Sequence, residues 1–202
     1  SIGDEESGAV TFLITLNTPL NQTSTDDSTP NFNFTVSGTE PSYFCELFIN
    51  NTGYGTATAN NNTATIITAN SSLSDGNYNW YINCTANSIT NQSEIRTITI
   101  DTTPPLTTIT SNGLNSSTTI TFTLNCSDAS SGCNATYYKV VSWSSACGST
   151  GYTEGTSGSI STDGDWKVCY YSVDNSGNME STKESNKFIL DSTSPSIYYN
   201  SN

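Results

Sequence analysis

The sequence contains no histidine, a single methionine and only five lysine and arginine residues. Without histidine, Ser-His-Asp and Cys-His arrangements cannot form, and no imidazole can act as a general acid or base. A formal net charge of −13 removes the electrostatic basis for binding nucleic acid or an anionic membrane. The longest apolar run, around Ala9 to Leu16, is far shorter than the roughly 18 residues of a transmembrane helix. We therefore expect no nucleic-acid partner and no membrane span in this segment.

The residues that are present favour strands over helices. Hydrophobic residues make up 33% of the chain and charged residues 11%, while Ser, Thr and Asn dominate the remainder. These three residue types favour strands, turns and solvated faces. A disordered chain of low hydrophobicity normally has few aromatic residues, whereas this one has 11 Tyr, 7 Phe and 3 Trp. We therefore expect a folded all-β protein whose aromatic rings fill small cores.

Two pairs of neighbouring carboxylates are candidates for acid–base chemistry, Asp26 with Asp27 and Asp163 with Asp165. Glycoside hydrolysis needs two carboxyl groups that face each other across a cleft. Both pairs lie instead in turn-like segments, where Asp commonly accepts hydrogen bonds from its own backbone. We expect no catalytic residue and no enzymatic activity.

The DNSGN segment at 174–178 offers Asp174, Asn175 and Asn178 as hard oxygen ligands for calcium. The same segment makes a good hairpin loop in which Gly177 takes a positive φ. We favour the hairpin, so the expectation is no cofactor, with calcium as the alternative.

The chain repeats itself with a period of about 90 residues. The segment DTTPP at 101–105 returns as DSTSP at 191–195, and each follows one strand-like segment and precedes another. An Asp-Gly turn opens an alternating aromatic strand at Asp75, and a second turn does so at Asp163. Two landmarks with nearly the same period predict a tandem array of similar units.

A unit of this size, with short alternating strands, predicts two tandem immunoglobulin-like β-sandwich domains joined by a short proline linker. We expect an N-terminal extension at 1–9, one domain at 10–103, a second at 104–194 and an orphan strand at 195–202. The predicted strands lie near 10–16, 31–36, 43–49, 63–68, 78–85, 94–100, 106–110, 117–125, 136–143, 157–162, 165–173 and 185–190.

The motifs CELFIN, NSSLSDGNYNWYINCTA and IRTITIDTTPP in the first unit resemble the Ig-like repeats of large archaeal and bacterial surface proteins. The second unit, with TFTLNCSDASSGC and DGDWKVCYYSVDNSGNMEST, resembles a related repeat of such proteins. The resemblance covers about 10–195. It implies an extracellular, usually glycosylated module with a spacing, adhesion, surface-layer or filament role.

The six cysteines form no C-x-x-C pair, and in a chain without histidine disulfides are their natural interpretation. Disulfides persist in oxidising compartments, which places the chain outside the cytosol. Aligning the two Asp-Gly turns puts Ser172 at the position of Cys84, and Cys169 at the outward position of Tyr81. Four cysteines in the second unit allow three pairings. We predict the bridges Cys45–Cys84, Cys126–Cys133 and Cys147–Cys169.

The segment SPSIYYNSN at the C-terminal end matches the first strand of a unit and has no body to pack against. An isolated strand with Ile197 and Tyr199 on one side is unstable alone. It begins a further repeat, completes the sheet of another copy, or is a truncated tail without a structural role. The N-terminal strand is the competing donor, through Val10, Phe12, Ile14 and Leu16.

We therefore expect an extracellular structural protein that is a subunit or segment of a cell-surface filament or surface layer. Its partners would be copies of itself or adjacent repeats, joined head to tail. The alternative is an adhesin or spacer stalk that recognises glycans or other cells.

We expect several of ten N-x-S/T sequons to carry glycans, because the chain is expected to be extracellular and none of the ten is forced into a core. Asn33, Asn83 and Asn125 lie on outward faces of the predicted strands, and the others lie in loops or at strand ends. Peptide mass spectrometry of native material should find these additions, and unmodified peptides throughout would contradict the expectation. The sequons are Asn21, Asn33, Asn50, Asn61, Asn70, Asn83, Asn91, Asn115, Asn125 and Asn134.

Overall fold

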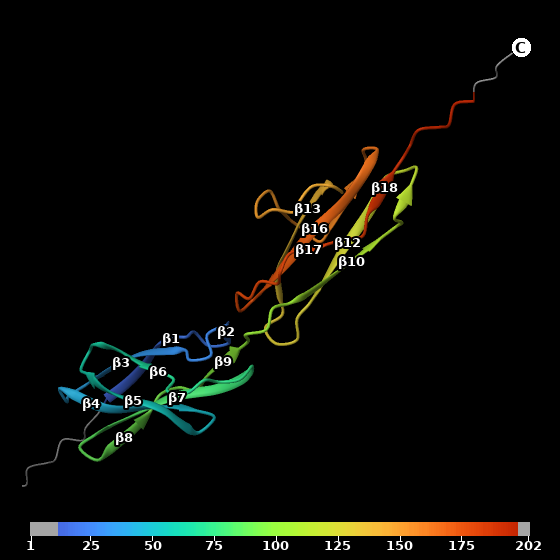
Figure 1. The fold of residues 1–202 in the computed structure, drawn as a ribbon. Coiled ribbons are helices and arrows are strands. Elements are labelled where there is room, and N and C mark those ends of the chain that lie inside the picture. Colours follow the sequence, from blue (N-terminus) through green and yellow to red (C-terminus); the bar gives the residue numbers. More distant parts are fainter. Residues whose placement is uncertain (1–11, 198–202) are drawn as a thin grey trace, which may run out of the picture. The chain divides into compact units, whose positions relative to one another are not determined.

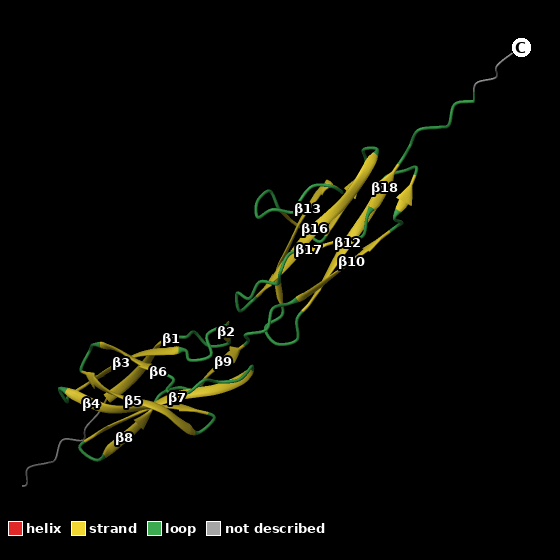
Figure 2. Cartoon of the chain, in the orientation of Figure 1, coloured by secondary structure: helices red, strands yellow, loops and turns green. Residues whose placement is uncertain are grey.

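Strands, turns and loops make up residues 12–197, the part of the chain that the computed structural model describes (Figure 2). The chain divides into two units, 1–103 and 104–202, so that Pro104 begins the second unit as it does in the predicted domains. The described residues include no helix that is long and apolar enough to cross a membrane.

Unit 1 consists of two facing sheets (Figure 1). The three-stranded sheet has the order β1-β3-β6, with strands β1 (Phe12–Thr18), β3 (Asn31–Gly38) and β6 (Ala64–Thr68). The larger sheet has the order β2-β9-β7-β4-β5, with β8 added beside β7. Its strands are β2 (Thr23–Thr25), β4 (Ser42–Ile49), β5 (Thr52–Asn60), β7 (Gly76–Ala86), β8 (Ile89–Gln92) and β9 (Arg96–Ile100).

The core of unit 1 follows from the alternation of apolar and polar residues along its strands. Phe32 and Phe34 of β3 are fully buried, and so are Trp80 and Ile82 of β7. The rings of Phe32 and Trp80 meet between the sheets, with centroids 4.7 Å apart. Nineteen buried residues form this core, which makes unit 1 a β-sandwich of the immunoglobulin-like type.

Unit 2 repeats the two-sheet plan (Figure 1). One sheet has the order β10-β12-β15, with strands β10 (Leu106–Ser111), β12 (Ile120–Ser127) and β15 (Ser157–Ile160). The other has the order β11-β18-β16-β13-β14, with β17 added beside β16. Its strands are β11 (Asn115–Ser116), β13 (Cys133–Ser142), β14 (Thr153–Glu154), β16 (Gly164–Asp174), β17 (Lys183–Glu184) and β18 (Phe188–Leu190). Its core has only eight buried apolar residues, so other interactions must stabilise this sandwich.

The sandwiches contain six strands that the sequence analysis does not predict: β2, β5, β8, β11, β14 and β17. The longest of them, β5, is rich in Thr, Gly and Ala and lacks the apolar alternation used to find strands. Tight turns connect β4 to β5 and β7 to β8, with Asn50, Asn51, Asn87 and Ser88 all at positive φ. Such turns favour Asn-Gly, so the pairs Asn-Asn and Asn-Ser are a weaker sequence signal for a hairpin.

The three disulfides join the pairs that the sequence predicts: Cys45–Cys84, Cys126–Cys133 and Cys147–Cys169. Cys169 alternates with Val168 and Tyr170, which belong to the core, so its side chain lies on the opposite face as expected. It is nevertheless fully buried, because Cys147, to which it is bonded, brings a loop over that face.

A hydroxyl network in unit 2 occupies the place of the inward disulfide of unit 1. Cys45 and Cys84 lie opposite each other on β4 and β7, with Cα atoms 4.1 Å apart. Thr136 and Ser172 are opposed in the same way on β13 and β16. The Ser172 hydroxyl lies 2.8 Å from that of Thr136 and 2.6 Å from that of Thr107 on the facing sheet. Hydrogen bonds therefore connect the two sheets of unit 2.

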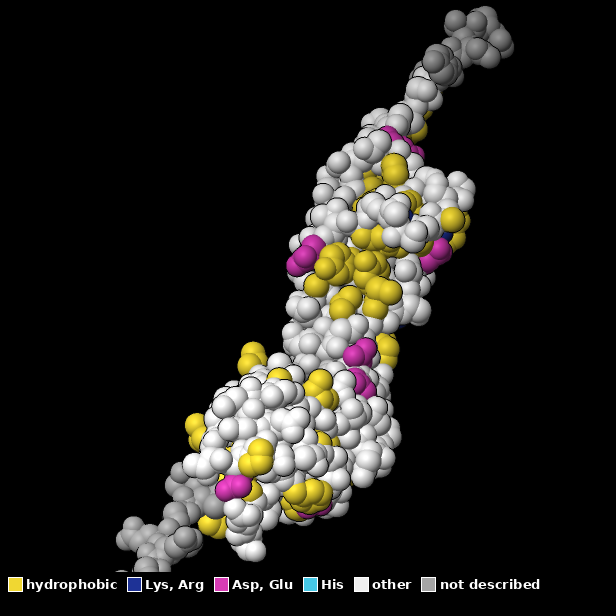
Figure 3. All heavy atoms as spheres, turned by 90° about the vertical axis from the view of Figure 1, so that its left-hand side faces the viewer, with side chains coloured by type: hydrophobic (Ala, Val, Ile, Leu, Met, Phe, Trp, Pro, Cys, Tyr) yellow, Lys and Arg dark blue, Asp and Glu magenta, His cyan; other side chains and the backbone are white. Residues whose placement is uncertain are grey.

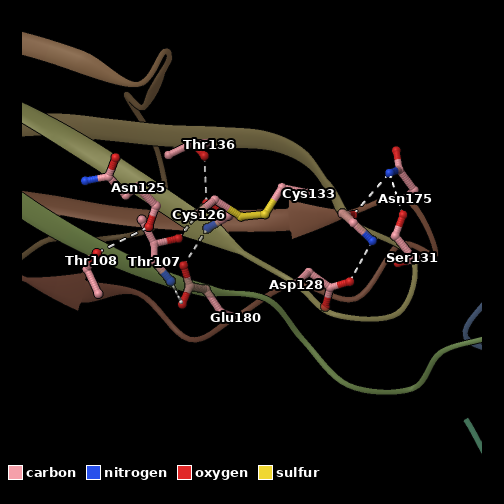
Figure 4. The surroundings of a disulfide bond; sticks show 12 residues. Thr107, Thr108, Asn125, Cys126, Asp128, Ser131, Cys133, Thr136, Asn175 and Glu180 are labelled. Carbon is pink, nitrogen blue, oxygen red and sulfur yellow. Dashed lines mark hydrogen bonds between the residues drawn. A yellow bond between two sulfur atoms is a disulfide. The ribbon is translucent and has the colours of Figure 1, made fainter.

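Glu180 completes this network (Figure 4). Its buried carboxylate accepts hydrogen bonds from the N–H groups of Thr107 (3.1 Å) and Ser172 (2.9 Å) and pairs with Lys183 at 2.6 Å. The Ser172 carbonyl in turn accepts the Glu180 N–H. Both backbone groups of Ser172 thus point away from β13, which makes Thr136 and Ser172 a non-hydrogen-bonded pair with close Cα atoms.

We predict that the double substitution Thr136→Cys with Ser172→Cys forms a fourth disulfide. The two positions are 36 residues apart, a separation at which the chain-entropy estimate is about 4 kcal/mol. Losing the Thr107 hydrogen bond removes about 1 kcal/mol. Urea unfolding under oxidising conditions should therefore show a gain of roughly 2–3 kcal/mol in the free energy of unfolding.

The controls are the single substitutions, each of which should be less stable than the unsubstituted chain. Peptide mapping of the double variant, T136C/S172C, must find the two introduced cysteines joined to each other. A double variant that lacks this bridge, or that is less stable than both single variants, would contradict the equivalence of the two sites.

Candidate assembly site

An aspartate at the start of β7 holds the linker that leaves unit 1. Asp75 precedes Gly76, whose φ of 154° suits the tight turn into the strand. One carboxylate oxygen accepts hydrogen bonds from the N–H and the hydroxyl of Thr102, both at 2.9 Å. The other accepts the Thr103 hydroxyl at 2.7 Å. We call this arrangement the linker clamp of unit 1.

Unit 2 has a matching linker clamp at its own exit. Asp163 precedes Gly164, whose φ is 141°. One oxygen of Asp163 accepts the N–H of Ser192 at 3.0 Å and its hydroxyl at 2.8 Å, and the other accepts the Thr193 hydroxyl at 3.2 Å. The Asp-Gly turn and the D-x-T motif, found separately in the sequence, are therefore two halves of one interaction.

Both clamps favour the ionised carboxylate. The hydrogen bond from the Thr103 hydroxyl, followed by those from Thr102, lowers the pKa of Asp75 below its ordinary value. The hydrogen bond from the Ser192 hydroxyl, followed by that from the Ser192 N–H, lowers the pKa of Asp163. Hydrogen bonding to the charged form is the cause in each case.

The two clamps lead into different surroundings. After the first, the chain enters β10 and pairs with β12 as the first strand of unit 2. After the second, residues 194–197 belong to no strand (Figure 1). Ile197 among them is 78% exposed. An apolar side chain is thus exposed to solvent at the place where, after the first clamp, the chain forms the paired strand β10.

The remaining residues of the predicted assembly set lie elsewhere. Phe12, Ile14 and Leu16 are buried in the core of their own unit through β1, so donating this strand would remove it from unit 1. Val10 and Tyr199 lie outside the described residues. The exposed Ile197 is therefore the member of the set that the structure leaves available.

The Cys126–Cys133 bridge closes a short loop that packs against the neighbouring hairpin (Figure 4). Asp128 within the loop accepts hydrogen bonds from the N–H groups of Ser130 and Gly132. The Asn175 side chain donates to the carbonyl of Gly132 at 3.1 Å, from the adjacent hairpin. The bridge and these hydrogen bonds fix the loop at one end of unit 2.

The adjacent DNSGN turn is the hairpin that the sequence analysis favours. Asp174 is buried, and one of its oxygens accepts the N–H groups of Ser176 and Asn178, both at 2.9 Å. The other accepts the side-chain amide of Asn178 at 2.8 Å. Gly177 has a φ of 99°. The carboxylate therefore caps its own turn, and calcium binding there stays an untested alternative.

The sequon side chains differ in how the fold uses their amides. Asn61 and Asn91 donate their Nδ2 groups to the carbonyls of Gly38 and Phe12, at 2.9 and 2.8 Å. Asn21 and Asn50 instead accept backbone N–H groups through Oδ1. The remaining sequon residues are exposed or partly exposed loop and strand positions, and none is buried in a core: Asn33, Asn70, Asn83, Asn115, Asn125 and Asn134.

Aromatic rings gather on the outer face of β13 and β16, and hydrophobic side chains are visible together on the surface of unit 2 (Figure 3). Tyr137 and Tyr171 stack with their centroids 5.2 Å apart. Tyr152 meets Tyr171 edge-on at 5.0 Å, and the Lys139 ammonium lies 4.5 Å from the Tyr152 ring centre. This partly exposed cluster was not singled out from the sequence, although alternation along both strands would have placed Tyr137 and Tyr171 outward.

No family model matches the sequence, and no curated protein matches it. Among solved structures, the chain resembles the fibronectin(III)-like modules of Clostridium thermocellum CbhA, at 11% identity and a TM-score of 0.48, over 94% of this chain and 100% of that one. It also resembles a tetra-tandem repeat in the extending region of a large adhesion protein, at 18% identity and a TM-score of 0.36. That match covers 92% of this chain and 50% of the other.

A further match is the D0-D1 domain of Intimin, at 13% identity and a TM-score of 0.31, over 90% of this chain and 98% of that one. These neighbours are tandem β-sandwich or adhesin repeat domains. The assignment of the fold rests on the chain's own paired sheets.

We predict that both linker clamps open in acid. A carboxylate whose pKa is lowered by folding contributes stability above its ordinary pKa of 3.8, and loses it as the pH falls through the lower folded value. NMR titration should show the amide signals of Thr102 and Ser192 moving with midpoints below pH 3.8.

Asp163→Asn should abolish the titration of the Ser192 amide and leave that of Thr102 unchanged, while Asp75→Asn should do the reverse. A midpoint at or above pH 3.8 in the unsubstituted chain would show that the clamps do not form in solution.

Proposed function

We propose that the chain is an extracellular structural subunit or segment of a cell-surface filament or surface layer. Its copies join head to tail, and the C-terminal segment of one copy adds as a strand to the sandwich of another. The proposal places its function in mechanical spacing and assembly rather than in catalysis.

The observation that carries the proposal is the second linker clamp. The first clamp delivers the chain into β10, the opening strand of a sandwich. The second holds Ser192 and Thr193 in the same manner and is followed by exposed residues with an apolar side chain at Ile197. A segment that is held at its start, and whose described residues after the clamp pair with no strand, favours pairing with an open sheet. A head-to-tail contact of this kind propagates as a filament unless it closes into a ring.

Three disulfides with no free cysteine among the described residues support an extracellular setting. Such bridges persist in oxidising compartments. They also suit a mechanical role, because each bridge limits how far its sandwich can unfold.

A second function is favoured by the tyrosine cluster on the outer face of unit 2. Flat, partly exposed rings such as Tyr137 and Tyr171 offer an amphipathic surface on which the apolar face of a sugar can stack. In this alternative the chain is an adhesin or spacer stalk that recognises glycans or other cells. Monodisperse monomers that bind a defined glycan would favour it over the filament.

Removing the C-terminal segment should abolish assembly. We expect deletion of residues 195–202, and separately the replacement of Ile197 and Tyr199 by Asp, to leave only monomers in sedimentation and electron micrographs. The physical reason is that a charge in the added strand must be desolvated without a partner. Circular dichroism and thermal unfolding should stay unchanged, because Ile197 contributes to neither core.

The control is Leu20→Asp, which places a negative charge at a loop residue that is 63% exposed and should assemble normally. If both C-terminal variants polymerise like the unsubstituted chain, the segment is a passive tail and the proposed mechanism is wrong at that end.

A further inference from the structure

The edge strand β5 lacks the features that normally protect a sheet edge. It pairs with β4 on one side and with no described strand on the other. Its nine residues, TGYGTATAN, include no charge and no proline. Sheet edges are usually protected by charge, proline or very short strands. The corresponding edge of unit 2, β14, has only two residues, one of them Glu154.

The other long edge strand of unit 1 is protected by side chains. Asn91 donates its amide to the carbonyl of Phe12 at 2.8 Å, and the Arg96 guanidinium donates to the carbonyl of Leu16 at 2.9 Å. These bonds satisfy outward backbone acceptors of β1. Of these two long edge strands, β5 is the one whose outward backbone groups lack this side-chain protection.

The strand register identifies the backbone groups that β5 exposes. Because the Cα atoms of Cys45 and Cys84 are only 4.1 Å apart, they form a non-hydrogen-bonded pair, and the backbone groups of Cys45 point towards β5. Its partner there is Ala57. By alternation, the N–H and C=O groups of Thr56 and Thr58 point away from β4.

Part of this edge is already satisfied within unit 1. The carbonyl of Tyr54 accepts the N–H of Asn70 at 2.9 Å, and that of Asn60 accepts the N–H of Thr63 at 3.1 Å. Between these two points, Thr56 and Thr58 offer two donors and two acceptors. No backbone group of another described loop or strand is bonded to them.

A groove of about 430 Å³ runs beside this stretch, between β5 and β6. Gly55 and Thr56 line it on one side, and Ile66 and Ile67 line it on the other. Ile66 is 54% exposed. Glu46, Thr68 and Asn70 also line the groove, so a strand added along Thr56 and Thr58 would meet both apolar and polar side chains on the side that faces β6. Backbone pairing with pockets for alternate side chains is how sheets recognise extended peptides.

We propose that the Thr56–Asn60 edge accepts residues 196–200 of a second copy as an added strand. The inference rests on the proposed head-to-tail assembly and names its acceptor. Residues 192–202 carry no charged side chain and β5 carries none, so pairing the two strands buries no ionised group of either strand. The nine residues after the clamp can extend about 30 Å, and five paired residues need only about 17 Å.

The test places a lysine on this edge in the full-length chain. Thr58 is exposed, so Thr58→Lys should preserve the sandwich while opposing strand addition. We expect the protein concentration needed for assembly, measured by sedimentation, to rise at least about tenfold, which is a loss of about 1.4 kcal/mol. The matched control is Thr52→Lys, at an exposed residue of the same strand before Tyr54. It should assemble normally.

A second measurement follows the backbone directly. A synthetic peptide of residues 194–202, added to the unsubstituted chain, should protect the amide protons of Thr56 and Thr58 from hydrogen exchange. Thr58→Pro removes the outward N–H without removing a bond to β4, and should abolish peptide binding.

The outcomes distinguish a failure of the proposed acceptor strand from a failure of the proposed function. Normal assembly of Thr58→Lys, together with loss of assembly on deleting residues 195–202, would refute β5 as the acceptor and leave strand donation standing. Assembly that is lost in Thr58→Lys but survives the deletion would show that β5 pairs with β5 of another copy, which overturns the occupant proposed here. Protection of neither amide by the peptide would refute the pairing itself.

Discussion

The fold depends on one cross-strand connection at the centre of each sandwich. A chain with only 33% hydrophobic residues has little apolar surface to bury, and both units add a connection between their central strands. Unit 1 uses the covalent Cys45–Cys84 bridge. Unit 2, with the smaller core, uses the hydroxyls of Thr136, Ser172 and Thr107 with the buried Glu180 carboxylate. The polar network is stable only as a whole, because an unpaired buried member costs more than a hydrogen bond contributes.

The linker clamps stabilise the chain between the repeats in the same way, through hydrogen bonds rather than through buried apolar surface. A carboxylate accepts from several donors at once, so a single Asp fixes both the N–H and the hydroxyl groups of the D-x-T motif. The clamp needs no apolar surface and lies within its own unit. A repeat built in this way sets the direction in which its chain leaves, whatever sequence follows the motif.

The sequence predicted the features that rest on strong local signals. Alternation placed Asn33 and Asn83 on outward strand faces, and their neighbours Phe32, Phe34 and Ile82 are buried in the core. The aligned turns showed that Cys169 does not take the place of Cys84, and the predicted cysteine pairs are the ones observed. The clamps were missed although both halves were found, because pairing Asp75 with Thr102 requires knowing that β7 and β9 are neighbours. The strands β5 and β8 were missed because long-range pairing, rather than local apolar content, makes them strands.

One physical cause explains why β5 was not predicted from the sequence and why its edge is open to a further strand. Thr, Gly and Ala give no periodic signal, and they also provide no charge, bulk or proline to block a second strand. Cys45, which fixes the backbone orientation of β4, determines through that orientation which groups of β5 face outward. The position of the bridge therefore also shows which backbone groups of that edge are offered to a partner. In unit 2 the corresponding edge strand, β14, has only two residues, and Cys147 ties a loop onto the same sheet.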